Sequence, residues 1–207
     1  MVNLKSTTMK IFRIALLSLV MCCSSAMAQT AKQVLDKASA TVSYSGGVSA
    51  HFSMSGSNGN ASGSIAVKGK KFHASTSLAS VWFDGKTQWT YMKKNNEVNV
   101  NNPSGTSLQA LNPYNFVNLY KSGYSYQMKK TGNKYEVHLT ATNKSKNIKE
   151  MYITVNSSNY VPTQVRMKQS KGWSTINISN FKKGNLSDNT FRFNAKEFPS
   201  AEVIDLR

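Results

Sequence analysis

The chain has 207 residues, and its 26 lysine and arginine residues against 9 aspartate and glutamate residues give a formal charge of +17 at pH 7. A chain of this length folds as one domain by default and would bury roughly 70% of its unfolded surface. Hydrophobic residues make up 40% of it, which is too many for a disordered chain. Nine acids spread over the whole length are too few for calcium loops, two-metal sites or dense carboxylate clusters. We therefore expect no metal and no cofactor.

The N-terminus, residues 1–28, has the features of a secretory signal peptide. A basic region with three positive charges precedes an apolar run over residues 14–21, and Ala26-Met27-Ala28 predicts cleavage before Gln29. The apolar run is too short to cross a bilayer comfortably, and no later stretch approaches about 20 apolar residues. The predicted mature chain is one domain, residues 29–207. It keeps 23 of the 26 basic residues and all 9 acids, so its charge is +14.

Both cysteines, Cys22 and Cys23, lie within the predicted signal. A lipoprotein would use one of them as an acylated N-terminus. The residues before Cys22 partly fit such a motif, although Met21 stands where a small residue is wanted. Simple cleavage is the favoured alternative, and lipidation of Cys22 or Cys23 is the other. Cleavage leaves a mature chain without cysteine, which excludes disulfides, thiol catalysis and cysteine-based zinc sites.

The mature chain begins with a helical pattern. Thr30 can cap a helix that ends near Val42, because Val34, Leu35 and Ala38 fall on one face of it together with Val42. Period-2 alternation of apolar and polar residues follows and continues through most of the remaining chain. That change of period predicts a short helix followed by strands.

The strand pattern occurs in two sets. The first covers residues 48–54, 63–67, 72–78, 81–84, 88–92 and 97–101. The second covers residues 124–129, 135–141, 148–155, 161–169 and 175–181. Turn dipeptides such as Asn58-Gly59 and Asp84-Gly85 separate the strands. About eleven short strands at regular spacing predict a mainly β fold built on one large antiparallel sheet, curled or barrel-like.

The strand pattern is interrupted at residues 107–120. Their apolar residues are Leu108, Leu111, Phe116, Val117 and Tyr120. Pro113 lies among them, so we expect two short helical turns or a kinked helix. A long antiparallel meander must bury one face, and helical segments seated on the concave side of a curled sheet would leave an apolar cavity.

Residues that could carry chemistry show no catalytic arrangement. His51, His73 and His138 fall in three separate strands without metal-ligand spacing, and no serine lies in a nucleophile-elbow motif. Lysines cluster at turns and strand ends, where they protect strand edges or attract an anionic surface. Nucleic-acid binding would need aromatic platforms among the basic residues, and predicted secretion argues against it. We expect neither enzyme activity nor a nucleic-acid partner.

Residues 82–91, Trp-Phe-Asp-Gly-Lys-Thr-Gln-Trp-Thr-Tyr, resemble a hairpin of the LolA-like outer-membrane lipoprotein carrier proteins. The resemblance continues through the N-terminal helix, the strand pattern at 63–72, the break near 112–116 and the C-terminal motifs at 188–206. It thus covers nearly all of residues 29–207. It implies a single large antiparallel curled sheet that forms an unclosed half β-barrel, with short helices as a lid over an apolar cavity.

The resemblance also implies a function, that of a monomeric periplasmic carrier that performs no covalent chemistry. Such a carrier takes acylated lipoproteins from an ABC-type releasing complex of the inner membrane and passes them to an outer-membrane acceptor. The residues expected on or near the cavity and lid are Trp82, Trp89, Tyr91, Leu108, Leu111, Phe116 and Val117. Family members often carry an arginine that latches the lid, and this chain departs from that pattern with Lys70 and Lys71. These lysines are the candidate latch, but lysine supplies the charge without the planar fork of donors that arginine has.

Two alternatives remain open. The first is a membrane-anchored acceptor or envelope-stress sensor of the same fold, which predicts acylation at Cys22 or Cys23. The second is a basic module that binds anionic glycan or lipid headgroups, which predicts binding that weakens as salt is added.

Overall fold

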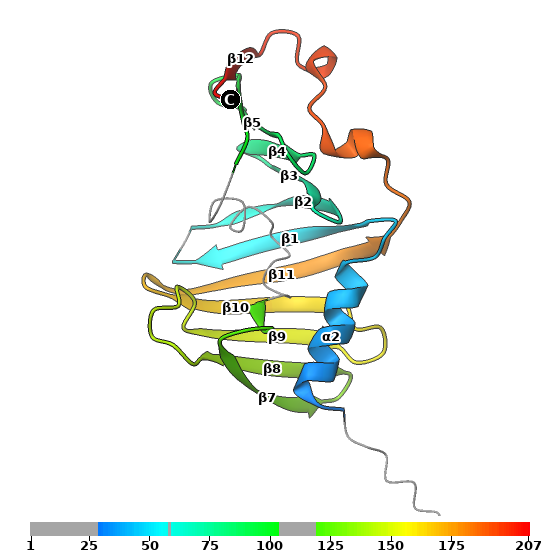
Figure 1. Ribbon diagram of the computed structural model, residues 1–207, viewed down its shortest axis with the longest axis vertical. Coiled ribbons are helices and arrows are strands. Elements are labelled where there is room, and N and C mark those ends of the chain that lie inside the picture. Colours follow the sequence, from blue (N-terminus) through cyan, green and yellow to red (C-terminus); the bar gives the residue numbers. More distant parts are fainter. Residues whose placement is uncertain (1–28, 58, 104–118) are drawn as a thin grey trace, which may run out of the picture.

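The computed structural model describes residues 29–57, 59–103 and 119–207, which form one twelve-stranded sheet with a helix against it (Figure 1). The strands are β1 (Val48–Gly56), β2 (Ala61–Lys68), β3 (Lys71–Thr76), β4 (Ala79–Phe83), β5 (Gln88–Met92), β6 (Glu97–Asn101), β7 (Tyr124–Thr131), β8 (Lys134–Ala141), β9 (Glu150–Asn156), β10 (Pro162–Gln169), β11 (Gly172–Lys183) and β12 (Glu202–Asp205). Their order in the sheet is β12-β6-β5-β4-β3-β2-β1-β11-β10-β9-β8-β7. The two ends, β12 and β7, are not joined, so the predicted mainly β, unclosed half-barrel is confirmed.

In the described part of the chain, most neighbouring strands are consecutive antiparallel partners. β1 and β11 are far apart in sequence but pair antiparallel, which joins the two halves of the chain into one sheet. β12 pairs with β6 in parallel. The predicted turn at Asp84-Gly85 is confirmed, because Gly85 has φ 103°, in the left-handed region that favours glycine. Asp84 Oδ1 accepts hydrogen bonds from the backbone N–H groups of Lys86 and Thr87 there.

The C-terminal region differs from the expected eleven strands. It contains two 3₁₀ helices, η1 (Asp188–Phe191) and η2 (Ala195–Glu197), and then the twelfth strand, β12. β12 has four residues, and its partner β6 lies in the other half of the chain, so no local alternation of apolar and polar residues predicts the pairing. The expected helical segment at 107–120 falls almost entirely outside the described residues and stays a prediction.

Helix α2 (Ala31–Val42) has the predicted position and cap. The Thr30 hydroxyl accepts a hydrogen bond from the backbone N–H of Gln33 at 3.2 Å, and the Gln33 side chain accepts one from the backbone N–H of Thr30 at 2.9 Å. This capping box satisfies two N–H groups that a helix start leaves free. Val34 and Leu35 are fully buried, which shows that the predicted apolar stripe faces the sheet.

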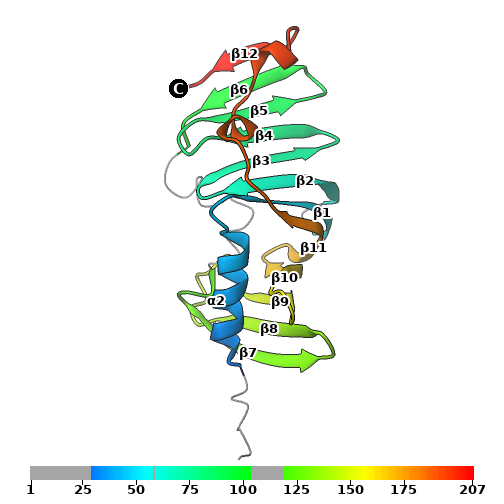
Figure 2. The ribbon, with the colours of Figure 1, turned by 90° about the vertical axis from the view of Figure 1, so that its right-hand side faces the viewer.

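The main core lies between α2 and one face of the sheet. It contains the buried stripe of α2 and alternate residues of β1–β4 and β7–β10, and we call this face the α2 side. Figures 1 and 2 show α2 against the half of the sheet formed by β7–β10. Most strands contribute every second residue, as a sheet with one buried face requires.

A second apolar layer lies on the opposite face of the sheet, which we call the outer face. Trp82 sits between Val81 and Phe83, which belong to the α2-side core, so the Trp82 side chain points the other way. Directly opposed residues share a face. Cross-strand pairing therefore places four further residues on the outer face, namely Trp89, Tyr91, Val98 and Val100.

The C-terminal segment, residues 184–201, covers this second layer. The ring of Trp82 lies 5.6 Å from that of Phe193 and 5.7 Å from that of Phe198, and the rings of Tyr91 and Phe198 are 4.7 Å apart. We call these four residues the outer aromatic cluster. Figure 2 shows the segment running past β2–β5 before β12 joins the sheet next to β6. The C-terminal segment therefore covers the outer face of the half of the sheet against which α2 does not pack.

Candidate ligand-binding face

The α2 side carries a row of apolar side chains that pack against the core but remain partly exposed. They come from β1, β3, β4, β10 and β11, whereas α2 packs against β7 and β8. We call them the apolar strip, and its members are Phe52, Ala74, Val81, Met167 and Ile178. Phe52 and Ile178 are direct cross-strand partners, and so are Ala74 and Val81. The strip is thus an accessible continuation of the buried core.

The sequence of β1 explains why the strip is apolar yet accessible. Val48, Ala50, Phe52 and Met54 alternate with polar residues and share one face. Along that face burial fades, because Val48 and Ala50 are buried and Phe52 and Met54 are only half-buried. A ligand that covered Phe52 and its neighbours would remove further apolar surface from water.

A polar connection fixes α2 beside the strip. The Tyr120 hydroxyl donates a hydrogen bond to Asp36 of α2, and Lys32 Nζ lies 2.7 Å from the same carboxylate. Lys32 and Tyr120 hold the pKa of Asp36 below its usual range because both donate to its charged form. Burial and the neighbouring Asp36 carboxylate raise the pKa of the Tyr120 hydroxyl. The link ties the helix to the chain just before β7.

The strip can hold a ligand only through contact and water exclusion. Its side chains carry carbon, hydrogen and one sulfur, with no nucleophile or proton carrier. Met167 adds a flexible, polarizable side chain that adapts to differently shaped apolar partners. Within the described residues, no group of three or more histidine, cysteine, aspartate or glutamate residues is arranged to hold a metal ion.

The predicted aromatic residues lie on the outer face rather than on the α2 side. Trp82 and Tyr91 contact the C-terminal segment in the outer aromatic cluster. Trp89 is opposite Trp82 and Val100 in the sheet and is half-buried. The structure therefore brings these three together, but away from the apolar strip.

The remaining predicted residues fall in two places. Leu108, Leu111, Phe116 and Val117 lie outside the described residues, and their expected role in the lid stays a prediction. The two predicted latch lysines are adjacent in sequence and differ sharply in their contacts.

Lys70 is exposed in the turn between β2 and β3, whereas Lys71 Nζ is 2.7 Å from Asp188 Oδ2 of η1. Lys68 Nζ lies 3.4 Å from the other oxygen of Asp188 and donates to the carbonyl of Leu186 at 2.8 Å. Lys71 and Lys68 hold the pKa of Asp188 below its usual range. Lys71 therefore connects the β2–β3 turn to the C-terminal segment.

Sequence reasoning did not single out the members of the apolar strip. The alternation in 48–54 placed Phe52 on an apolar face, but it could not show that Phe52 would stay half-exposed. The pairing of β1 with β11 brings Ile178 beside Phe52, and that pairing joins distant parts of the chain. A search for the apolar faces of both central strands would have found the pair only if this register had been known.

Comparison with known proteins identifies relatives of the fold and of the sequence. Residues 21–171 match the model of a family described as outer membrane lipoprotein carrier protein LolA. An uncharacterized conserved protein from Thermus thermophilus is similar in structure, with a TM-score of 0.59 and 12% identity over 86% of this chain and 99% of that chain. That likeness supports the fold alone.

Two more distant structural similarities involve LolA superfamily and MucB proteins. A LolA superfamily protein from Nitrosomonas europaea has a TM-score of 0.41 and 14% identity over 80% of this chain and 99% of that chain. The Pseudomonas aeruginosa MucA/MucB complex has a TM-score of 0.44 and 9% identity over 79% of this chain and 60% of that chain. A search of curated proteins finds no significant match. None of the helices in the described residues has the length and apolar character needed to cross a membrane.

Proposed function

The chain belongs to the family of outer membrane lipoprotein carrier proteins LolA, and from this premise we propose that it is a periplasmic carrier of lipoproteins that holds their acyl chains against the apolar strip. The observation that carries the proposal is the half-exposed row of Phe52, Ile178 and their neighbours, continuous with the core on the α2 side. The carrier receives its cargo from an ABC-type complex of the inner membrane and delivers it to an acceptor at the outer membrane. It performs no covalent step.

The energetics of the cargo explain why such a surface is needed. Each buried methylene is worth about 0.8 kcal/mol, so a 16-carbon acyl chain represents roughly 12 kcal/mol of shielding from water. A carrier must offset that cost and still release the chain. A row of partly exposed side chains next to a helix tied by a few polar contacts suits release better than a closed pocket does.

Binding is tested by displacement of a fluorescent fatty acid from the mature chain, starting at Gln29. Ile178→Asp places a carboxylate in the apolar strip, and we expect the affinity for the probe to fall at least about tenfold, because a buried charge is costly. Val203→Asp is the matched control, since Val203 lies on β12 and is 51% exposed. Circular dichroism and unfolding curves establish that both variants fold, and Phe52→Ala gives a milder second test.

Two results would contradict the proposal. One is a wild-type protein that binds no acyl probe while a deletion strain sorts its lipoproteins normally. The other is an affinity for the probe that Ile178→Asp and Phe52→Ala leave unchanged. Mass measurement of the mature N-terminus separates the carrier from a membrane-anchored acceptor, since a chain that starts at Gln29 has lost Cys22 and Cys23.

A further inference from the structure

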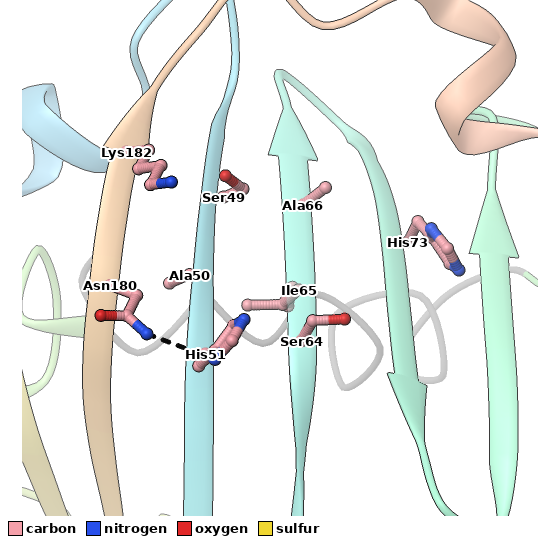
Figure 3. A pocket seen from close by; sticks show the side chains of 9 residues that line it. All are labelled: Ser49, Ala50, His51, Ser64, Ile65, Ala66, His73, Asn180 and Lys182. Carbon is pink, nitrogen blue, oxygen red and sulfur yellow. Dashed lines mark hydrogen bonds between the residues drawn. The ribbon is translucent and has the colours of Figure 1, made fainter.

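A hollow of about 450 Å³ lies on the outer face at β11, β1, β2 and β3 (Figure 3). Ser49 in its lining alternates with the core residues Val48 and Ala50, so the Ser49 side chain points away from the apolar strip. The core residues Ala50 and Ile65 also border the hollow. Small side chains form its floor, and larger polar ones surround them. The proposed carrier function makes no use of it.

Cross-strand register explains the shape of the hollow. Ser49 is opposite Ala66, and His51 is opposite Ser64, so three small side chains lie side by side on β1 and β2. His73 on β3 is opposite Ala66. The small residues leave a depression where larger side chains would fill the surface, and the two histidines stand at its sides (Figure 3).

A β-bulge supplies the remaining wall. The register between β1 and β11 shifts by one residue between Ser49 and His51, and Asn180 in β11 has φ 52°, a left-handed conformation that asparagine tolerates. The extra residue places Asn180 beside His51, and Asn180 Nδ2 donates a hydrogen bond of 3.4 Å to His51 Nδ1 (Figure 3). This contact fixes the position of the imidazole, whose other ring nitrogen, Nε2, remains for a ligand.

The lining of the hollow is rich in hydrogen-bond donors and has one positive charge. Lys182, opposite Ser49, supplies the charge. The hydroxyls of Ser49 and Ser64 and the imidazole of His51 supply further donors. Of the described residues that line the hollow, none carries a carboxylate. An anion would therefore meet a charge and several donors without direct repulsion.

His73 connects this hollow to a second one of about 650 Å³ at the C-terminal segment. Its Nε2 is buried and has no hydrogen-bond partner among the described residues, and burial lowers its pKa. The second hollow contributes the cations Arg192 and Lys196 and one carboxylate, Glu197. Arg192 is itself 3.5 Å from Asp84. The second hollow thus carries charges of both signs, and together the two hollows give room for more than a bare ion.

We propose that the hollow bounded by His51, His73, Asn180 and Lys182 binds the phosphate group of a larger ligand. Lysine is a common phosphate ligand in proteins, and serine hydroxyls and imidazole N–H groups donate to the oxygens that remain. A phosphate group has enough oxygens to accept from all these donors, whereas a carboxylate has two. The phosphate belongs to a lipid headgroup or to a soluble phosphate ester, and the two sources are separable by experiment.

Imidazole signals in NMR spectra of the mature protein provide the test, because the chain has three histidines. During titration with glycerol 3-phosphate, we expect the signals of His51 and His73 to shift and saturate. His138 should stay unchanged, since it stacks on Tyr152 at 4.2 Å outside the hollow. Lys182→Ala should weaken binding about tenfold, as expected for loss of a charged hydrogen bond.

Lys183→Ala is the matched control. It removes the same charge from the next residue, whose Nζ lies 5.5 Å from the ring centre of Tyr44 rather than in the hollow. Equal weakening in both lysine variants would overturn the proposal, because it would indicate general charge attraction. Equal shifts of all three histidines would do the same.

Vesicles identify the source of the phosphate. Co-sedimentation with phosphatidylglycerol–phosphatidylcholine vesicles that depends on Lys182 but not on Lys183 supports a lipid headgroup. Saturable binding of glycerol 3-phosphate without vesicle binding supports a soluble ester. Failure of both arms overturns the proposal, and neither outcome depends on whether the apolar strip binds an acyl chain.

Discussion

Helix α2 and the C-terminal segment cover opposite faces of the same sheet, and they do so in different ways. α2 presents one buried stripe to β7 and β8 and leaves the apolar strip half-exposed. The C-terminal segment inserts Phe193 and Phe198 against Trp82 and Tyr91 and is fixed at both ends. A partial cover leaves apolar surface available for a ligand, whereas a close-fitting cover stabilises one end of the half-barrel.

The fixing of the C-terminal segment also protects a strand edge. Lys71 holds its start through Asp188, and β12 holds its end through parallel pairing with β6. Without β12, β6 would be the edge strand and would expose a row of unpaired backbone groups. The C-terminal segment therefore stabilises the outer face at this end of the sheet, and the proposed binding surface lies on the α2 side.

The largest effect expected from breaking this arrangement comes from Trp82→Ala. Trp82 is 7% exposed and contacts Phe193, Phe198 and the ring of His73. Removal of a buried tryptophan side chain costs about 3–5 kcal/mol, and urea unfolding monitored by circular dichroism measures the loss. Trp89→Ala, the same change at a half-buried neighbour, is the control. Equal losses in the two variants would mean that the outer aromatic cluster does not anchor the segment.

Leu35→Ala tests the other cover. Leu35 is fully buried under α2, and its truncation should lower the free energy of unfolding by about 2–5 kcal/mol. It should also change the affinity for a fluorescent fatty acid, because α2 borders the proposed ligand-binding face, whereas Trp82→Ala should leave that affinity unchanged. If instead Trp82→Ala changed the fatty-acid affinity and Leu35→Ala did not, the binding face would be the outer face and not the α2 side.

Only part of this arrangement, in which α2 and the C-terminal segment cover opposite faces of the sheet, could be predicted from the sequence. Helix α2 was predictable because its cap and its stripe depend on neighbouring residues, Thr30 and Gln33 for the cap and Val34 and Leu35 for the stripe. The Asp84-Gly85 hairpin was predictable for the same reason. Each of these features is decided by physics that acts over a few residues.

The placement of Trp82 could not be predicted from alternation. Val81, Trp82 and Phe83 are consecutive apolar residues, so β4 has no polar face that would mark one side as solvated. Such a run indicates a strand buried on both faces, which is what the structure shows, but it does not say which segment covers each face. The bulge at Asn180 has no sequence signal either, since one inserted residue changes the register without changing the strand pattern.

A smaller effect is expected from the polar link that holds α2. Tyr120→Phe removes the hydrogen bond to Asp36 and should cost about 0.5–1.5 kcal/mol near neutral pH. Asp36 has a lowered pKa in the folded protein, so its contribution is present above the unfolded value near 3.9 and is lost as the pH falls through the folded value. The difference between wild type and Tyr120→Phe should therefore shrink below about pH 4.

The same variant should also differ from wild type at alkaline pH, where the stability of the wild type falls as the pH rises rather than as it drops. The pKa of Tyr120 is raised in the folded protein, so above about pH 10 the unfolded chain loses this proton first and wild-type stability falls. Tyr120→Phe should lack that part of the fall in stability.

The control for the acid range is Tyr124→Phe, which removes a hydrogen bond to the carbonyl of Ile148, because its effect on stability should not change between pH 7 and pH 3. A Tyr120→Phe effect that stays constant below pH 4 would rule out the charged link.

The smallest effect distinguishes the two predicted latch lysines. Lys71→Ala removes the contact with Asp188, and because exposed ion pairs are weak, we expect amide hydrogen exchange in η1 to rise a few-fold at most. The difference in exchange between Lys71→Ala and wild type should shrink at high salt, because salt already screens the ion pair in the wild type. Lys70→Ala, which removes the same charge from the adjacent turn position, should leave exchange in η1 unchanged. If both variants raise exchange equally, the local positive charge of the β2–β3 turn holds the segment. If only Lys71→Ala does so, and the fatty-acid affinity stays constant, the latch belongs to the structural cover of the outer face and not to the ligand-binding side.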